Sequence, residues 1–332
     1  MRQKTLLLFF VFLSATLFGQ NVYIPDANFK DYLVGNSAIN TNNDNEIQVS
    51  EANSFDGQIQ IFEQYISDLT GLEAFTSLTK LILQDNSIFN IDVSQNIALE
   101  RLVCADNYLT SLDVSQNTAL TELYCYMNQI TSLDVSNNTS LTLLSCFTNQ
   151  LSQIDVSQNT NLEALSVSSN QLTSLDVSQN TAMTYLECNN NQLTTLDVSQ
   201  NNILSELHCR QNELTCLNVA NGNNINFNND LPTNGFYVDF NPNLTCIEVD
   251  NVNWANANWG NQLNGLSSPQ AFFSENCYNE CLISSSLTEL STSRNLIQIL
   301  DMMGRETSFK PNTPLIYVYD DGSTEKVFSV GY

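Results

Sequence analysis

One hexapeptide recurs six times along the chain, each time with an aspartate at the same place. It reads LDVSQN at 112–117, 175–180 and 196–201, IDVSQN at 91–96 and 154–159, and LDVSNN at 133–138. Successive copies start 21 residues apart. A short period of fixed length predicts a solenoid of similar stacked coils. Because each coil can bury its apolar side only against its neighbours, the repeats cannot form one globular core.

Two other residue types, asparagine and cysteine, also recur every 21 residues. In the coil around Leu123 and Cys125, apolar and polar residues alternate, which predicts a short strand with one buried face. We expect successive strands to form a parallel sheet, and Leu133 and Val135 to line the opposite inner wall. The asparagines should turn inward and bind backbone groups. The two columns are Asn86, Asn107, Asn128, Asn149, Asn170, Asn191 and Asn212, and Cys104, Cys125, Cys146, Cys188 and Cys209, with Val167 in the cysteine gap.

One unit reads Leu120-x-x-Leu123-x-Cys125-x-x-Asn128-x-Ile130, which resembles the leucine-rich repeat signature L-x-x-L-x-L-x-x-N/C-x-L. With cysteine at the third leucine position and LDVS behind it, the repeat is most similar to those of internalin-like bacterial surface proteins, of the internalin J type. The resemblance covers about 78–219. It implies a leucine-rich repeat solenoid of parallel strands and short coils, with an EF-hand-like helical cap before it.

The first residues have the character of an export signal. Arg2 and Lys4 precede an apolar run of 13 residues from Leu6 to Phe18. That run is too short to span a bilayer, which takes about 20 residues, but it fits a secretory signal peptide. We expect 1–19 to be a signal peptide, and the mature chain to be secreted or at the outer cell surface without a transmembrane segment.

Residues 20–77 should cap the first coil. Phe29, Tyr32 and Leu33 lie at helical spacing and predict a short amphipathic helix. The loop NTNNDNEIQVSE at 40–51 follows the calcium-loop template D-x-[DN]-x-[DN]-G-x5-E, except that Asn40 replaces the first Asp and Asn45 the glycine. The sequence leaves two interpretations open, a calcium site or a metal-free structural cap. The candidate ligands are Asn40, Asn42, Asp44, Glu46 and Glu51.

The period decays after Asn212, and two further segments follow. We interpret 220–281 as a C-terminal cap, with Trp254 and Trp259 covering the last coil. Residues 282–332 alternate apolar and polar residues in three short runs and predict a small β-module. This module resembles the type A C-terminal sorting domain of Bacteroidetes type IX secretion substrates, which implies that machinery as a partner. The matching residues are Leu300, Met303, Gly304, Arg305, Leu315, Ile316, Tyr317, Val318, Tyr319, Lys326 and Val327, with the DDG turn between them.

The cysteines and the aspartates each allow two interpretations. The cysteine column can hold disulfides or, as we favour, buried reduced thiols that act as small apolar fillers. Outside it we expect a disulfide in the cap, between Cys246 and Cys277. Stacked aspartates repel one another. Two factors can offset this repulsion: hydrogen bonds from the following Ser and the turn amides, or cations between coils. The stacked aspartates are Asp92, Asp113, Asp134, Asp155, Asp176 and Asp197.

Charge and motif content exclude several classes of function. The chain has 10 Lys and Arg against 35 Asp and Glu, a formal net charge of −25. Such a surface repels nucleic acid and anionic membranes. His208 is the lone histidine, no Ser/His/Asp or Cys/His set can be built, and no phosphate loop or dinucleotide motif is present. We expect no enzyme.

The outward positions of the strands vary while the scaffold positions do not. Exposed aromatic residues there are typical of recognition surfaces. The sequence therefore favours an adhesion or recognition protein that binds a protein or glycan on its strand face. A structural envelope or matrix spacer without a specific ligand is the alternative. The candidate ligand-binding residues are Arg101, Tyr124, Tyr126, Phe147, Tyr185 and Arg210.

Overall fold

The structure is a computed structural model, and it describes residues 19–227, 235–264, 271–277, 296–301, 305–307, 314–319 and 324–328. It divides into two compact units, Met1–Leu282 and Ile283–Tyr332. The expected signal peptide, apart from Gly19, lies outside the described residues. So do Met303, Gly304 and the DDG turn at 320–322 of the expected sorting domain.

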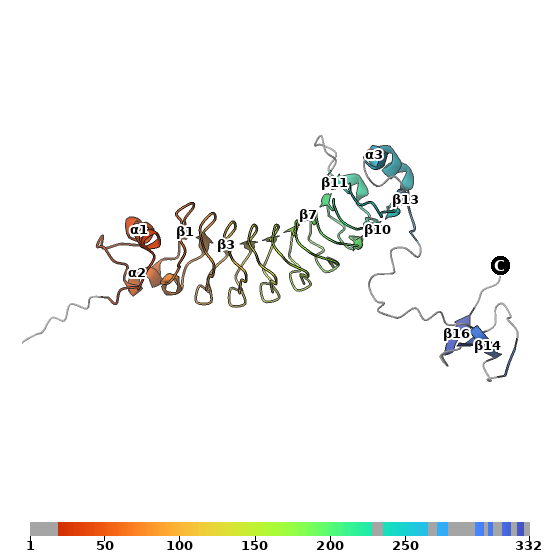
Figure 1. Cartoon of the computed structure of the whole chain (residues 1–332), viewed down its shortest axis with the longest axis horizontal. Helices are drawn as coiled ribbons and strands as arrows, with labels where there is room; N and C mark the ends of the chain where they lie inside the picture. Colours follow the sequence, from red (N-terminus) through yellow and green to blue (C-terminus); the bar gives the residue numbers. More distant parts are fainter. Residues whose placement is uncertain are drawn as a thin grey trace, which may run out of the picture. The chain divides into compact units, whose positions relative to one another are not determined.

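The first unit is a solenoid of short coils, which confirms the predicted fold class (Figure 1). In the described residues, nine parallel strands form its main sheet in the order β1-β2-β3-β4-β5-β6-β7-β9-β11. The sheet starts before residue 78 and continues past residue 219, so it extends beyond the expected repeats at both ends. The strands are β1 (Gln58–Gln60), β2 (Lys80–Ile82), β3 (Arg101–Val103), β4 (Glu122–Tyr124), β5 (Leu143–Ser145), β6 (Ala164–Ser166), β7 (Tyr185–Glu187), β9 (Glu206–His208) and β11 (Phe236–Tyr237).

A second parallel sheet forms on the opposite wall at the C-terminal end of the stack. There the hexapeptide and its later equivalents become strands, which pair in the order β13-β12-β10-β8. The last full coil therefore runs from β11 to β12 and is separated from the preceding repeats by an insertion at 222–235. The strands are β8 (Thr195–Asp197), β10 (Cys216–Asn218), β12 (Cys246–Glu248) and β13 (Phe272–Ser274).

One buried asparagine per coil ties neighbouring backbones together, as expected. Asn128 donates through Nδ2 to the carbonyls of Cys104 (3.0 Å) and Cys125 (3.1 Å), and its Oδ1 accepts from Leu109 N (2.9 Å). The residue before each asparagine has a left-handed backbone, Met127 with φ 52° being one case. These bonds hold a turn that non-glycine residues otherwise disfavour. The same position is left-handed at Asp85, Asp106, Thr148, Ser169, Asn190, Gln211 and Phe240.

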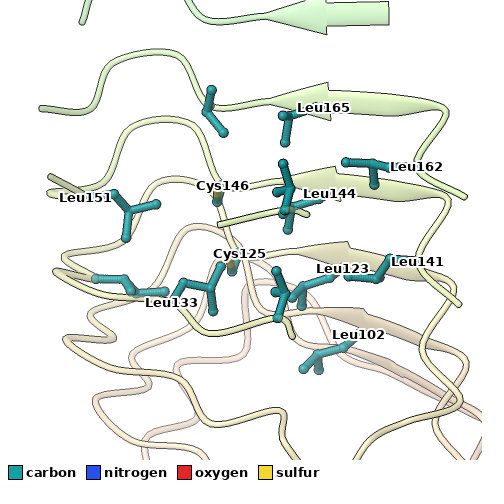
Figure 2. Packing of buried hydrophobic residues seen from close by; sticks show 14 of the residues in the cluster. Leu102, Leu123, Cys125, Leu133, Leu141, Leu144, Cys146, Leu151, Leu162 and Leu165 are labelled. Carbon is teal, nitrogen blue, oxygen red and sulfur yellow. The ribbon is translucent and has the colours of Figure 1, made fainter. Parts of the chain in front are cut away.

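Leucine and cysteine side chains fill the interior between the two walls (Figure 2). Leu123, Leu144 and Leu165 lie one behind the other on successive strands and are fully buried. A second asparagine series, which the sequence analysis did not single out, closes the hexapeptide wall. In it Asn138 donates to the carbonyls of Val114 (3.0 Å) and Asn117 (2.9 Å). Stacking, rather than any single coil, therefore supplies the core.

The N-terminal cap contains helices α1 (Ala27–Gly35) and α2 (Val49–Ser54) and the 3-10 turn η1 (Leu72–Ala74). Asp26 caps α1 by accepting from Phe29 N at 3.0 Å. Phe29 and Leu33 of α1 are fully buried, which confirms the predicted amphipathic helix. The cap thus covers the apolar end of the stack.

The C-terminal cap contains η2 (Asn224–Asn226) and helix α3 (Val252–Asn264), which lies between β12 and β13 in the chain. Trp259 is fully buried and its ring packs on Phe236 with centroids 4.4 Å apart. Cys246 and Cys277 form a disulfide with their Cα atoms 6.0 Å apart, the pair named from the sequence. Cys216 is also disulfide-bonded.

In the second unit, the described strands β14 (Leu296–Asp301), β15 (Pro314–Tyr319) and β16 (Thr324–Phe328) form an antiparallel sheet in that order. The predicted small β-module therefore has strands at the expected runs. Within the described residues of the chain, no helix combines the length and the apolar composition needed to cross a bilayer.

Candidate ligand-binding face

Most coils present three outward side chains on the main sheet. On the three-residue strands they are the first and last residues and the residue two places beyond the strand, as in Glu122, Tyr124 and Tyr126. On β11, whose Phe236 is buried in register with Leu207, the outward side chains are Tyr237 and Asp239. We call the surface formed by these positions on β2 to β7, β9 and β11 the strand face. Because neighbouring strands pair in register, Glu122 lies beside Arg101 and Leu143, and each position forms a column across the sheet.

The predicted residues near the N-terminal end of the strand face contact one another. We call Arg101, Glu122, Tyr124, Tyr126 and Phe147 the Tyr124 cluster. Arg101 Nη1 lies 3.1 Å from Glu122 Oε2, and its guanidinium lies 5.1 Å from the centre of the Tyr124 ring. Tyr124 donates its hydroxyl to Glu122 at 3.1 Å. Tyr126 and Phe147 stack with centroids 4.4 Å apart and planes 6° apart.

A second group lies farther along the strand face, and we call Tyr185, His208, Arg210, Tyr237 and Asp239 the His208 cluster. The His208 ring lies 5.5 Å from Tyr185 and 4.4 Å from Tyr237. Arg210 lies 4.3 Å from the Tyr237 ring centre and its Nε 2.7 Å from Asp239 Oδ2.

Tyr237 and Asp239 were not among the predicted residues, because the insertion at 222–235 interrupts the 21-residue step. Val238 and Asn241 nevertheless repeat the spacing of Cys209 and Asn212, and this spacing was the available signal.

The aromatic residues are less exposed than the sequence analysis expected. Tyr124, Tyr126, Phe147 and Tyr185 are all half-buried rather than free. Strands about 4.8 Å apart place large side chains over their smaller neighbours. Ala105, one of the expected outward positions, is fully buried for this reason. The rings are therefore held in place by packing, which lowers the entropy cost of binding a partner.

Basic residues gather on the strand face. Residues 19–282 contain only Lys30, Lys80, Arg101 and Arg210 as Lys or Arg. The last three of them lie on the strand face. In a chain with a net charge of −25, this distribution sets the strand face apart from the rest of the solenoid surface.

Two solved structures have similar folds. The functional domain of InlJ from Listeria monocytogenes, which includes a cysteine ladder, is 31% identical, has a TM-score of 0.50, and is aligned over 70% of this chain and 58% of its own length. Internalin C2 from the same organism is 19% identical with a TM-score of 0.51, over 57% of this chain and 86% of its own. This chain has the leucine-rich repeat fold. It spans 58% of the length of the InlJ domain. The sequence matches no protein-family model and no curated protein.

The hexapeptide wall of the leucine-rich repeats holds its aspartates through local hydrogen bonds. Asp113 Oδ1 accepts from Ser115 N at 2.9 Å, and Asp134 Oδ1 accepts from Ser136 N at the same distance. Hydrogen bonds from the Ser115 hydroxyl and amide lower the pKa of Asp113, and they outweigh the repulsion by neighbouring aspartates. The first of the two interpretations, hydrogen bonding within the turn, is therefore supported.

The column cysteines are free and buried, as favoured from the sequence: Cys104, Cys125, Cys146, Cys188 and Cys209. Burial raises the pKa of the Cys104 and Cys146 thiols to about 12. Because the thiolate is the reactive form, these side chains are inert while the repeats stay folded.

The loop at 40–51 is closed by its own side chains. Glu51 Oε1 accepts from Thr41 N, Thr41 Oγ1 and Asn42 N, and its Oε2 accepts from Gln48 N. Asp44 accepts from Glu46 N and from the Asn42 and Gln48 side chains. Glu46 pairs with Lys30 at 2.8 Å.

Donor groups thus point at the oxygens that a calcium ion would need, and only Asn40 Oδ1 is buried without a donor. Calcium takes six to eight oxygen ligands. The described residues contain no group of three or more His, Cys, Asp or Glu placed to hold a metal. The loop closes on itself through hydrogen bonds here, and both interpretations, a calcium site at Asn40, Asn42, Asp44, Glu46 and Glu51 and a metal-free cap, stay predictions.

We expect Glu51→Gln to destabilise the N-terminal cap by about 1–3 kcal/mol at neutral pH, because an amide cannot accept all four of these bonds. Burial opposes ionisation of Glu51, but hydrogen bonds led by that from Gln48 N hold its pKa below the usual 4.5. A depressed pKa gives stability that is present above pH 4.5 and lost as the pH falls further. Urea unfolding at pH 7 and pH 3 should show a larger difference between the two proteins at pH 7. An equal difference at both values would contradict this.

Proposed function

We propose that this leucine-rich repeat protein is an adhesion or recognition protein that binds a protein or glycan ligand through its strand face. The observation that carries the proposal is the gathering of packed aromatic and basic side chains at positions that the repeat leaves free. Tyr and Arg in such settings dominate the energy of protein interfaces. The likeness to the InlJ functional domain supports a binding role.

We further propose that the protein is exported and acts outside the cell or on its outer surface. The basic start and apolar run at 2–18 support a signal peptide. The resemblance of 282–332 to a type A sorting domain supports passage through the type IX secretion machinery. We expect the mature protein to be detected in the medium and on intact cells. When 282–332 is deleted, we expect it to stay inside the cells.

The strand face is tested by the double substitution Tyr124→Ala with Phe147→Ala in the mature chain. Loss of both rings should weaken binding at least about 30-fold, since each is placed as a hot-spot residue worth about 2 kcal/mol or more. The measurement is binding to a glycan array and to a panel of purified extracellular proteins.

A matched control is available in the double substitution Phe89→Ala with Tyr108→Ala. These two rings also stack, with centroids 5.1 Å apart, and both are exposed. Phe89 and Tyr108 come after Asn86 and Asn107 of the asparagine column, beyond the outward strand positions, and so lie off the strand face. Binding that both double variants retain in full would contradict the strand face as the binding site, and the absence of any ligand for the unsubstituted chain would favour the second candidate, a spacer whose repeats recognise nothing.

A further inference from the structure

The Tyr124 and His208 clusters are separated by one strand with small outward side chains. We call Ala164, Ser166 and Ser168 the β6 strip. Ser168 holds the place that Phe147 and Asn189 hold on the adjacent coils, and in register Ala164 lies beside Tyr185. Strands are spaced by about 4.8 Å. Small residues on one strand therefore leave room beside the Tyr185 ring for a side chain supplied by another molecule.

Two carboxylates near Tyr185 differ from the other acids of the strand face: Glu187, which lies beside Ser166, and Glu206, which lies beyond Tyr185 on β9. Glu122 and Asp239 are each neutralised by an arginine. Glu187 instead accepts from Ser166 Oγ at 2.7 Å and from Asn189 Nδ2 at 3.2 Å. Glu206 accepts from His208 at 2.9 Å. Among the described residues, neither forms an ion pair with Lys or Arg.

Two further observations lie on the same strip. The Ser168 hydroxyl is buried and has no hydrogen-bond partner, although the residue is only 7% exposed. The pKa of Tyr185 is raised, first by burial and then by the negative charges of Glu187 on its own strand and Glu206 on the adjacent strand β9. The electrostatic potential at the ring is therefore negative, which favours a cation there.

Resting on the proposed function of the strand face, we propose that its ligand is a basic polypeptide, one of whose Lys or Arg side chains lies on the β6 strip against Tyr185, with its charged end at Glu187 and near Glu206. The aliphatic stem crosses Ala164, and Ser166 holds the Glu187 carboxylate at the edge of the strip. The charged end meets the ring and the two carboxylates, a combination of cation–π attraction and charge pairing.

The charge of the whole chain acts in the same direction. A net charge of −25 draws basic partners and repels acidic ones at distances up to about a Debye length. A neutral glycan gains nothing from either the long-range attraction or the charges of Glu187 and Glu206, which are bound by Ser166, Asn189 and His208 but by no Lys or Arg of the described residues. The combination therefore favours a basic protein over an uncharged sugar as the ligand.

The test uses the full mature chain and fluorescently labelled octapeptides of lysine, of glutamate and of alternating glycine and serine. We expect only the lysine peptide to bind, and to bind more weakly as salt rises from about 50 to about 300 mM. Glu187→Gln with Glu206→Gln should weaken binding about tenfold or more, because each removes a charged partner. Ala164→Tyr, which fills the strip without changing the charge, should cause a similar loss.

The matched control is Glu63→Gln with Glu213→Gln, which removes the same charge from two exposed residues outside the strip. It should change affinity less than twofold. Equal weakening by both pairs would overturn the proposal, since net charge alone would then explain binding. Failure of the lysine peptide to bind would also overturn it. If glycans or neutral proteins nevertheless bound in a way that needs Tyr124 and Phe147, the proposed function would stand and this inference alone would fall.

Discussion

Asn149→Ala should lower the free energy of unfolding by roughly 3–5 kcal/mol, although it truncates a single side chain in the middle of the stack. Asn149 donates to the carbonyls of Cys125 and Cys146 at 3.0 and 3.1 Å and accepts from Ile130 N at 2.9 Å. Alanine would leave these buried groups without partners. It would also release the left-handed turn at Thr148, whose φ is 54°.

Gln150→Ala is the control for Asn149→Ala, because Gln150 is the next residue and is exposed. Its substitution should change stability by less than about 0.5 kcal/mol. Urea unfolding followed by far-ultraviolet circular dichroism measures both. A loss below about 1 kcal/mol for Asn149→Ala would show that water replaces the hydrogen bonds of the Asn149 side chain and that the asparagine column does not hold the coils together.

Trp259→Ala has the second of the two largest expected effects. This side chain is fully buried and packs on Phe236, Phe227 and Phe273, with ring centroids 4.4, 5.6 and 6.0 Å away. Truncating a buried tryptophan costs about 3–5 kcal/mol. Because coils stack in one dimension, the loss should be felt first in the last coil, and β11 should exchange its amide hydrogens faster than β4.

Trp254→Ala serves as the comparison, since Trp254 is only half-buried on the same helix α3. We expect a smaller loss, about 1–2 kcal/mol, and little change in exchange at β11. Hydrogen exchange with mass spectrometry resolves the two ends of the stack. Uniformly faster exchange from β4 to β11 in Trp259→Ala would mean that the solenoid unfolds as one unit rather than from its end.

The period of the sequence was enough to predict the scaffold. The alternation around Leu123 and Cys125 set the inner and outer faces of each strand, and the asparagine column set the turn. Both follow from local geometry that every coil repeats, so one coil predicts the next. The second sheet was not predicted, because Leu196 and Asp197 lie in a strand while the equivalent Leu112 and Asp113 do not. That difference depends on the neighbours across the stack, not on the residues themselves.

The strand face could be predicted in position but not in its contacts. Register alone places Tyr126 beside Phe147, and they do stack. The half-burial of Tyr185 and the pairing of Arg210 with Asp239 depend on side-chain packing across coils. The pairing of Arg210 with Asp239 also depends on the coil that follows the insertion at 222–235. The lysine-binding proposal rests on the difference between Glu122 and Asp239, which an arginine neutralises, and Glu187 and Glu206, which no Lys or Arg of the described residues neutralises. This difference also depends on neighbours in three dimensions.

The identical bonding of successive coils makes distance along the solenoid an adjustable property. Only β6 lies between the strands of the Tyr124 cluster and those of the His208 cluster in the order of the sheet. Gain or loss of one coil there would change the separation of the two clusters by about 4.8 Å. Each remaining coil would keep the hydrogen bonds of its buried asparagines. Such a chain can be matched to a longer or shorter ligand by coil number, without altering a residue of the Tyr124 cluster or the His208 cluster.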